Sequence, residues 1–421
     1  MRGFESRRLH GPASASVYDA CGEALCSPSP SLAQGSNTRV AKHENRVILL
    51  GCGAVGTVAA RHLAASKAVG SLTAADVSAE RAKATAAATR SRKVRPLVLD
   101  LEDDGALRDA IRGASLVINA ALPKYNLAIM AATLEADVDY MDLAGGGKDQ
   151  LALDAAWRRT GRTALLGMGE DPGLGNVFAR HAADGMDEVD AVRIRDGETA
   201  RSAEHPFICL FSPEVFVQET IEPAIVYESG RWSHVPPFSG REEYPFPPPV
   251  GPVPVYHVNH EEVETIPKFL GKRPAYTDFK LALLPDTVRT LQFVAAAGIM
   301  RDPGLRRAFL ATIPPPGSLA GKITGYASIL VEVAGRADGR DVTHTVWSSM
   351  DHVRAAKRHG TTGTAWLTGT GAAVGALLLL ERTAPPGVLV PEQLDPGAVF
   401  AHLRGRDVEV RERIVRERTL T

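Results

Sequence analysis

The residues with the clearest chemical use are the glycines in the stretch Gly51-Cys52-Gly53-Ala54-Val55-Gly56. In such a G-x-G-x-x-G pattern, Gly51 permits a tight turn, Gly53 lets the backbone approach a pyrophosphate, and Gly56 lets a helix pack closely on its strand. The helix that follows directs its free N–H groups and the positive end of its dipole at the phosphates. We therefore expect a dinucleotide at this loop, in contact with Gly51, Gly53, Ala54, Val55 and Gly56.

An acidic residue then follows at the distance that suits binding of a ribose. Asp76 ends the strand-like run 71–75 and stands twenty positions after Gly56. An acid there accepts hydrogen bonds from the ribose hydroxyls of adenosine and repels a 2′-phosphate, so it favours NAD over NADP. Arg81 and Lys83 lie just downstream. Either could be recruited to a phosphate, which keeps NADP as an alternative.

Further candidates follow other strand-like runs, because parallel α/β sheets bind ligands at the carboxyl ends of their strands. Asp100 would contact the adenine amine or cap the next helix. Small residues at Ala120 and Ala121 suit a cofactor that lies flat against the chain. Glu170 and Asp171 would bind a substrate ammonium or cap the helix after them. The cofactor contacts expected at these strand ends, besides Asp76, are Val77, Asp100, Leu101, Ala120, Ala121 and Leu122.

The elements that must position these residues alternate between strand and helix. Strands are predicted at 46–50, 71–75, 96–100, 116–120, 139–143 and 163–167, and helices at 55–68, 78–90, 103–112, 125–136 and 148–159. This alternation predicts an α/β fold, with a doubly wound parallel sheet of the Rossmann type.

The pattern changes after residue 186, where a second, α+β domain with an open mixed sheet is expected. A hairpin is predicted from 322–335 and 340–349, with Asp338-Gly339 at its tip. The proline-rich stretch 235–254 is expected to be a long surface loop, and such loops are often lids. We expect a disordered extension at 1–44, the Rossmann domain at 45–174, the inserted domain at 175–350, and C-terminal helices at 351–421 that pack back on the Rossmann domain.

Composition and charge narrow the class of protein. The chain has 421 residues, of which 44% are hydrophobic and 23% charged, as in an ordinary globular protein of two domains. A net charge of −1 argues against nucleic acid or an anionic membrane as a partner. The four cysteines lack the paired spacing of a zinc site or a disulfide framework. The longest apolar run, 372–380, is too short to span a membrane. We expect a cytoplasmic protein.

Several stretches between residues 46 and 414 match a known family in collinear order. They are VILLGCGAVG (47–56), VINAALPKYNLAIMAATLEADVDYMDLAG (117–145), GMGEDPGLGNVFARHAAD (167–184) and TGTGAAVGALLLLERTAPPGVLVPEQLDP (368–396). With them the chain resembles the saccharopine dehydrogenase family, in the branch of saccharopine reductase, lysine 6-dehydrogenase and carboxynorspermidine dehydrogenase. It departs from the family at 195–198, where relatives often have a glycine pair and this chain has Arg-Asp-Gly-Glu.

The resemblance implies hydride transfer between NAD(P) and a carbon bearing nitrogen, on an amino acid or an amino-acid-derived imine. It also implies a homodimer or a higher homo-oligomer. For this chemistry we expect Lys124 or Asp142, with Tyr125 beside them, to handle the proton. Lys124 could instead be a solvated lysine, and Asp142 could cap the glycine turn at 145–147.

Substrate contacts are expected from Glu170, Asp171, Arg195 and His260, since Arg suits a carboxylate. We expect no metal, because His257 and His260 lack a third ligand in their motif. Two other functions remain open. One is a cyclodeaminase-like enzyme that uses bound NAD without net redox change. The other is an inactive dinucleotide-binding module.

Overall fold

The structure, a computed structural model, describes residues 45–417; the expected extension at 1–44 lies outside them. A seven-stranded parallel sheet has the strand order β17-β6-β5-β4-β1-β2-β3. Its strands are β1 (Asn45–Leu50), β2 (Val69–Asp76), β3 (Val94–Val98), β4 (Leu116–Asn119), β5 (Asp139–Asp142), β6 (Thr163–Leu165) and β17 (Gly387–Leu389). All six strands predicted for this region are present, and the Rossmann-type fold is confirmed.

Helices connect these strands, as the sequence predicts. They are α1 (Ala54–Ala65), α2 (Ala79–Ala88), α3 (Asp104–Ile111), α4 (Asn126–Glu135), α5 (Lys148–Leu151) and α6 (Asp154–Thr160). The last two replace the single helix expected at 148–159. The central strands β1 and β4 are largely buried and rich in Val, Ile and Leu, as expected for a parallel sheet covered by helices.

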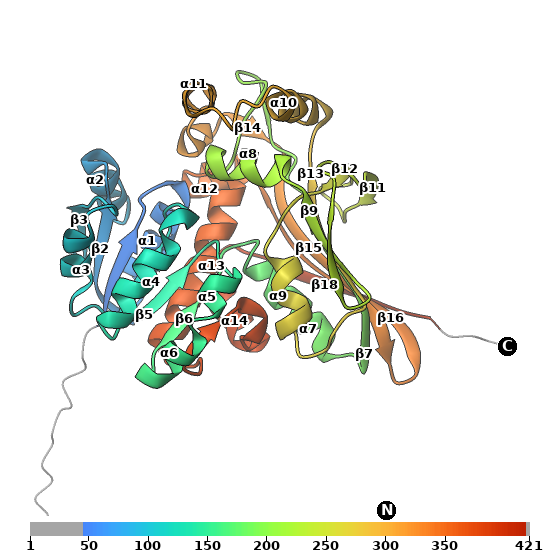
Figure 1. Ribbon diagram of the computed structural model, residues 1–421, viewed down its shortest axis with the longest axis horizontal. Helices are drawn as coiled ribbons and strands as arrows, with labels where there is room; N and C mark the ends of the chain where they lie inside the picture. Colours follow the sequence, from blue (N-terminus) through green and yellow to red (C-terminus); the bar gives the residue numbers. More distant parts are fainter. Residues whose placement is uncertain (1–44, 418–421) are drawn as a thin grey trace, which may run out of the picture. The chain divides into compact units, whose positions relative to one another are not determined.

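A second, mixed sheet has nine strands in the main order β10-β9-β13-β7-β15-β16-β18, with β12 and β11 added beside β13. Its strands are β7 (Glu188–Asp196), β9 (Ala224–Glu228), β10 (Arg231–Val235), β11 (Glu242–Pro245), β12 (Pro252–His257), β13 (Tyr276–Ala282), β15 (Tyr326–Ala337), β16 (Arg340–Asp351) and β18 (Val410–Glu417). The predicted hairpin is β15–β16, and its turn is at Asp338-Gly339. Figure 1 shows the parallel sheet on the left and the mixed sheet on the right.

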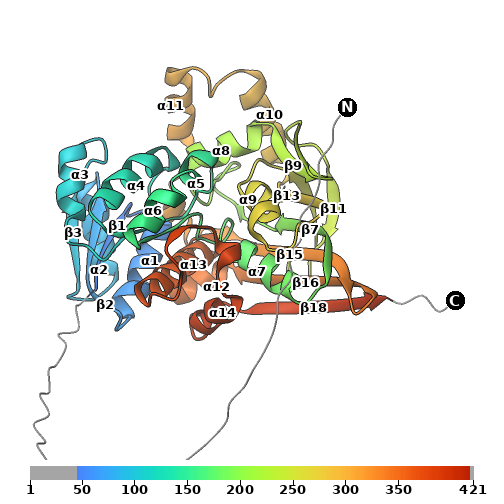
Figure 2. The same cartoon turned by 60° about the horizontal axis from the view of Figure 1, so that its bottom comes forward.

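Further helices lie around the mixed sheet. They are α7 (Leu174–Asp184), α8 (Pro213–Ile221), α9 (Glu262–Phe269), α10 (Pro285–Ala296), α11 (Pro303–Thr312), the 3-10 turn η2 (Pro316–Leu319), and α12 (His352–His359), with α14 (Pro396–Leu403) near the end. Residues after 351 return to both sheets, because β17 extends the parallel sheet and β18 lies beside β16 at the edge of the mixed one (Figure 2).

The sequence predicts one long loop for the proline-rich stretch 235–254. The structure instead forms part of it into a hairpin. Strand β11 pairs with β12, and β12 pairs with β13. Prolines are tolerated there because β11 and β12 lie off the main path of the sheet, at its margin. Pro245 and Pro252 face each other at the end of the hairpin next to its connecting loop, 246–251.

Helix α13 (Gly363–Leu380) joins the two sheets, since it packs on α1 and contacts β4, β5, β15 and β16. It is the one helix among the described residues that is long and apolar enough to cross a membrane by composition, yet 83% of its 18 residues are buried in the protein. Its glycines explain the close packing. A Cβ on Gly371 would lie 2.1 Å from the Gly169 carbonyl oxygen.

We predict that Gly371→Ala destabilises the protein by about 1–3 kcal/mol, because the added methyl group overlaps a backbone carbonyl that cannot rotate away. Urea denaturation followed by circular dichroism measures the loss. Gly105→Ala in α3 is the matched control, since its nearest neighbour would be a side-chain oxygen at 3.5 Å. Equal stability of the two variants would contradict the close packing of α13.

Candidate functional site

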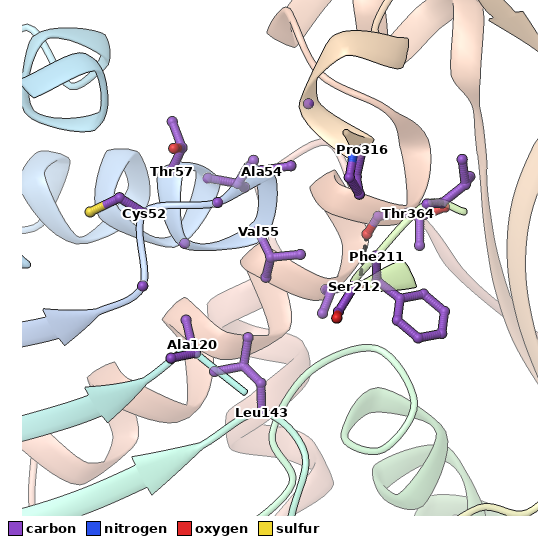
Figure 3. Close-up of a pocket in the computed structure, with 18 of the residues that line it drawn as sticks. Cys52, Ala54, Val55, Thr57, Ala120, Leu143, Phe211, Ser212, Pro316 and Thr364 are labelled. Carbon is purple, nitrogen blue, oxygen red and sulfur yellow. Dashed lines mark hydrogen bonds between the residues drawn. The ribbon is translucent and has the colours of Figure 1, made fainter. Parts of the chain in front are cut away.

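A cavity of about 1980 Å³ lies where the carboxyl ends of the parallel strands meet the second sheet. One side comes from the glycine loop and the turns after β2, β4 and β5. The other side comes from α8, the segment 258–261, β13, η2 and the start of α13. Figure 3 shows Val55, Ala120 and Leu143 on the first side, with Phe211, Thr364 and Pro316 facing them.

The glycine loop has the geometry that a pyrophosphate needs. A Cβ on Gly51 would lie 2.5 Å from the Ala120 oxygen, and one on Gly56 would lie 2.1 Å from the Gly51 oxygen. These two glycines are therefore required by packing. A Cβ on Gly53 would meet nothing within 4 Å, so it would occupy the open space beside the loop. No side chain caps α1, which leaves its first N–H groups to a ligand or to water. The loop fits a dinucleotide.

Asp76 braces this loop as well as facing the cavity. Its Oδ2 accepts a hydrogen bond from the Cys52 N–H at 2.9 Å. Its Oδ1 accepts from the Ser78 N–H at 2.8 Å and from Arg81 at 2.7 and 3.1 Å. Burial by itself would raise the pKa of Asp76, but these hydrogen bonds, above all those from Arg81, hold it below its ordinary value. Asp76 is thus a carboxylate at neutral pH, with little of Oδ1 left for a ribose.

The structure brings every predicted cofactor residue to this one cavity. The lining includes Gly51, Gly53, Ala54, Val55, Gly56, Asp76, Val77, Asp100, Leu101, Ala120, Ala121 and Leu122. Sequence reasoning did not select Pro315, Pro316, Gly317 and Ser318, which also line it. None of the described residues 235–254 does, so the segment placed to cover the cavity is 315–318 and not the proline-rich stretch.

The three expected proton-handling residues are placed differently. Tyr125 lines the cavity. Lys124 is outside it, with 59% of its side chain exposed and its Nζ 3.7 Å from Glu102. Lys124 is therefore placed as a solvated lysine, which was the alternative to a proton-handling role.

Asp142 is buried and does not line the cavity. Its carboxylate accepts from the Gly167 N–H at 2.7 Å, from Gln150 at 2.8 Å and from Tyr140 at 3.0 Å. Burial raises the pKa of Asp142 to about 6. The structure therefore does not support a catalytic role for Asp142, and its contacts are those of a structural brace.

Arg195 also lies outside the cavity. Its guanidinium is buried and forms two hydrogen bonds with Asp278, at 2.8 and 3.1 Å, and an ion pair with Glu242 at 3.1 Å. It cannot reach a substrate in this position. Side chains alternate along a strand, so the next residue of β7, Asp196, points the opposite way and lines the cavity. The sequence pointed to the correct strand but the wrong face.

Four carboxyl groups line the inner part of the cavity: Asp171, Asp196, Glu219 and Glu261. We call them the acid wall. The carboxyl groups of Asp171 and Asp196 are close enough to influence each other's pKa. Burial, with nearby acids, raises the pKa of Asp171 well above its ordinary value and that of Asp196 to about 7. Burial likewise raises the pKa of Glu219 to about 8.

Other acids lie behind the wall. Glu170, an expected substrate contact, is buried, does not line the cavity, and accepts from Thr368 at 3.5 Å. Glu198 accepts from His352 at 2.9 Å and from Thr364 at 2.6 Å. Of the four acid-wall residues, the sequence analysis predicted only Asp171 as a site residue. The departure from the family pattern at 195–198 could have indicated Asp196.

His260, an expected substrate contact, lines the cavity beside the acid wall. Its ring stacks on Phe279 with centroids 4.0 Å apart, and its Nδ1 contacts Glu262 and lies 3.7 Å from Glu261. Burial alone would lower the pKa of His260, but the acids around it, Glu262 first, raise it to about 10. His260 is therefore an imidazolium among carboxyl groups.

Comparisons with known proteins show which family the two domains of the chain match. A family model described as the saccharopine dehydrogenase NADP binding domain matches residues 47–165, and one described as the saccharopine dehydrogenase C-terminal domain matches 169–406. A carboxyaminopropylagmatine dehydrogenase from Synechocystis is 29% identical over 85% of this chain and 95% of its own length. A carboxynorspermidine synthase from Vibrio cholerae is 30% identical over 67% of this chain and 73% of its own length.

Solved structures agree on the fold. Saccharopine dehydrogenase (L-Glu forming) from Saccharomyces cerevisiae has a TM-score of 0.67 at 16% identity and covers 88% of this chain and all of its own. Homospermidine synthase from Legionella pneumophila, in complex with NAD, has the same TM-score at 14% identity and covers 88% of this chain and 91% of its own.

The acid wall predicts an unusual pH dependence of stability. Asp196 and Glu219 keep their protons in the folded protein to pH 7–8 but lose them near pH 4 when unfolded. The folded state binds more protons between these values, so the free energy of unfolding falls by a few kcal/mol as pH rises from 5 to 9. Urea denaturation of the ligand-free protein at several pH values measures this fall.

Glu219→Gln tests the source of this effect, because a neutral side chain there removes one titrating group. We expect a flatter pH dependence and higher stability at pH 8.5. Glu214→Gln, on the same helix but outside the cavity lining, should keep the wild-type slope. A wild-type stability that rises with pH over this range would refute the assignment.

Proposed function

The chain belongs to the saccharopine dehydrogenase family, and we propose that it is an NAD(P)-dependent oxidoreductase acting on a C–N bond of an amine conjugate with several positive charges. The observation that carries this proposal is the acid wall, which lies in the same cavity as the glycine loop. Clustered carboxyl groups recognise a substrate with several ammonium groups, since such a cation offsets the cost of burying them.

The relatives support this choice of substrate class. They are named for carboxyaminopropylagmatine and carboxynorspermidine, which are carboxyl-bearing amine conjugates, and not for lysine. The resemblance implied an amino acid or an amino-acid-derived imine, and within that class the number of acids in the cavity favours a longer amine conjugate.

The bound nicotinamide cofactor would supply hydride exchange with the carbon of the C–N bond. Glycines 51, 53 and 56 and the N-terminus of α1 would hold its pyrophosphate. Phe211, Leu143 and Ala120 line the cavity with apolar side chains that would exclude water from the reacting groups.

Proton transfer falls to the Asp171–Asp196 pair. We propose that these two carboxyls, whose pKa values are raised, share one proton and that the pair donates it to the nitrogen of an imine as the carbon is reduced. In the opposite direction the same pair accepts the proton from the amine. Glu219 and Glu261 would bind more distant ammonium groups, and the imidazolium of His260 would bind the substrate carboxylate.

We predict that Asp196→Asn and Asp171→Asn lower kcat/KM by about 10²- to 10⁴-fold, because the shared proton is lost. The assay follows absorbance of the reduced nicotinamide with carboxylated polyamine conjugates, diamines and diamino acids in both directions. Lys124→Gln should stay within about twofold of wild type, since Lys124 is outside the cavity. Turnover with lysine alone, unaffected by either Asp variant, would refute the proposal. Tightly held cofactor with no net redox change would indicate the cyclodeaminase-like alternative.

The adenosine end of the cavity bears on the choice between NAD and NADP. Arg81 lines the cavity, and 56% of its side chain is exposed beside Asp76. Since Oδ1 of Asp76 already accepts three hydrogen bonds, Arg81 offers more to a 2′-phosphate than Asp76 offers to a ribose hydroxyl. We therefore propose NADP as the preferred cofactor. Asp76 considered alone favours NAD, but its engagement by Arg81 reverses that preference.

Arg81→Ala should weaken NADPH binding by about 10- to 100-fold and leave NADH binding nearly unchanged, as expected for loss of a charge-assisted hydrogen bond. Quenching of protein fluorescence by each nucleotide measures both dissociation constants. Lys83→Ala, on the same helix but outside the cavity lining, is the control. An equal loss for both nucleotides would show that Arg81 only braces Asp76.

A further inference from the structure

Three side chains of metal-ligand type meet where α7, β16 and β18 pack together. Nε2 of His181 and Nε2 of His344 each lie 2.9 Å from Oε2 of Glu412. The three candidate ligand atoms all fall within 4.8 Å of one another. None of these residues lines the cavity, so the proposed oxidoreductase does not account for the cluster.

The backbone holds the three residues in place. Glu412 of β18 is paired with Val346 of β16, two residues along from His344, so both side chains project from the same face of the sheet. Helix α7 packs on β16 and brings His181 over that face. Phe400 contacts the His181 ring edge-on with centroids 5.0 Å apart, and the two imidazoles meet edge-on at 5.5 Å. Packing therefore orients both rings before any ion is present.

The ligand types in the cluster suit a cation. Imidazole nitrogen and carboxylate oxygen are preferred ligands of Zn²⁺ and its first-row neighbours. Bonds of about 2.0–2.1 Å in a tetrahedron place ligand atoms roughly 3.3 Å apart. The observed 2.9 Å needs only a small opening, and the Glu412 side chain, 52% exposed, is free to make it.

We propose that His181, His344 and Glu412 form a divalent transition-metal site of the Zn²⁺ type, with solvent in the remaining position. The site would tie β18, the edge strand of the mixed sheet, to α7. Its effect would be to stabilise that edge, since an ion bound only by the folded state raises the free energy of unfolding.

The test uses the full chain without a histidine tag, freed of metal by a chelator. We expect isothermal titration calorimetry with Zn²⁺ to show one site, with a raised melting temperature. Co²⁺ in its place should give the visible absorption bands of a tetrahedral ion. Glu412→Gln and His344→Ala should each weaken Zn²⁺ binding at least tenfold and abolish the stabilisation.

A matched control is available elsewhere in the chain. His402 lies 3.0 Å from Glu381 and forms a His–Glu pair outside the cluster. His402→Ala should bind Zn²⁺ as the wild type does. If His344→Ala fails to fold, Glu412→Gln and His181→Ala decide the question, because both residues are partly exposed. Absence of stoichiometric Zn²⁺ binding, or binding unaffected by these variants, would mean that the cluster is only a hydrogen-bonded network.

Discussion

Backbone contacts that only glycine permits hold the cavity edge of the parallel sheet together. Gly56 brings α1 against the Gly51 carbonyl, and Gly371 brings α13 against the Gly169 carbonyl, each with room for no Cβ. The first contact fixes the loop that faces the cofactor. The second fixes the turn 169–173, which carries Asp171. Because α1 also packs on α13, the phosphate-facing loop and the acid-bearing turn are positioned by one helix pair.

The carboxyl groups of the acid wall are half-buried and lie close together in the cavity. A ligand-free cavity with Asp171, Asp196 and Glu219 together is costly, and the protein reduces that cost by keeping protons on them. A cationic substrate would allow the same groups to ionise. In the function proposed above, the same carboxyl groups would both bind a polyamine-type substrate and hold a proton near the reacting nitrogen.

Much of the fold could be predicted from local patterns. The six strands after residue 45, the β15–β16 hairpin and α13 follow from apolar runs, from Asp-Gly at a turn, and from glycine- and alanine-rich helical spacing. The short strand β17 was not predicted, because three residues carry too little pattern and its place depends on pairing with β6. The proline-rich stretch was predicted as a loop, since prolines exclude a central strand but not a hairpin at the margin of a sheet.

By itself the sequence determined the dinucleotide loop, because its strand, glycines, helix and Asp76 all lie within about thirty contiguous residues and act through local geometry. It also determined the family, through motifs spread over the chain. Only the tertiary structure decided which charged residues face the cavity. Arg195 and Asp196 are adjacent in sequence, yet strand alternation buries Arg195 against Asp278 and turns Asp196 toward the cavity. Asp142 likewise does not face the cavity, because its carboxylate accepts hydrogen bonds from Gln150 and from the Gly167 N–H inside the domain.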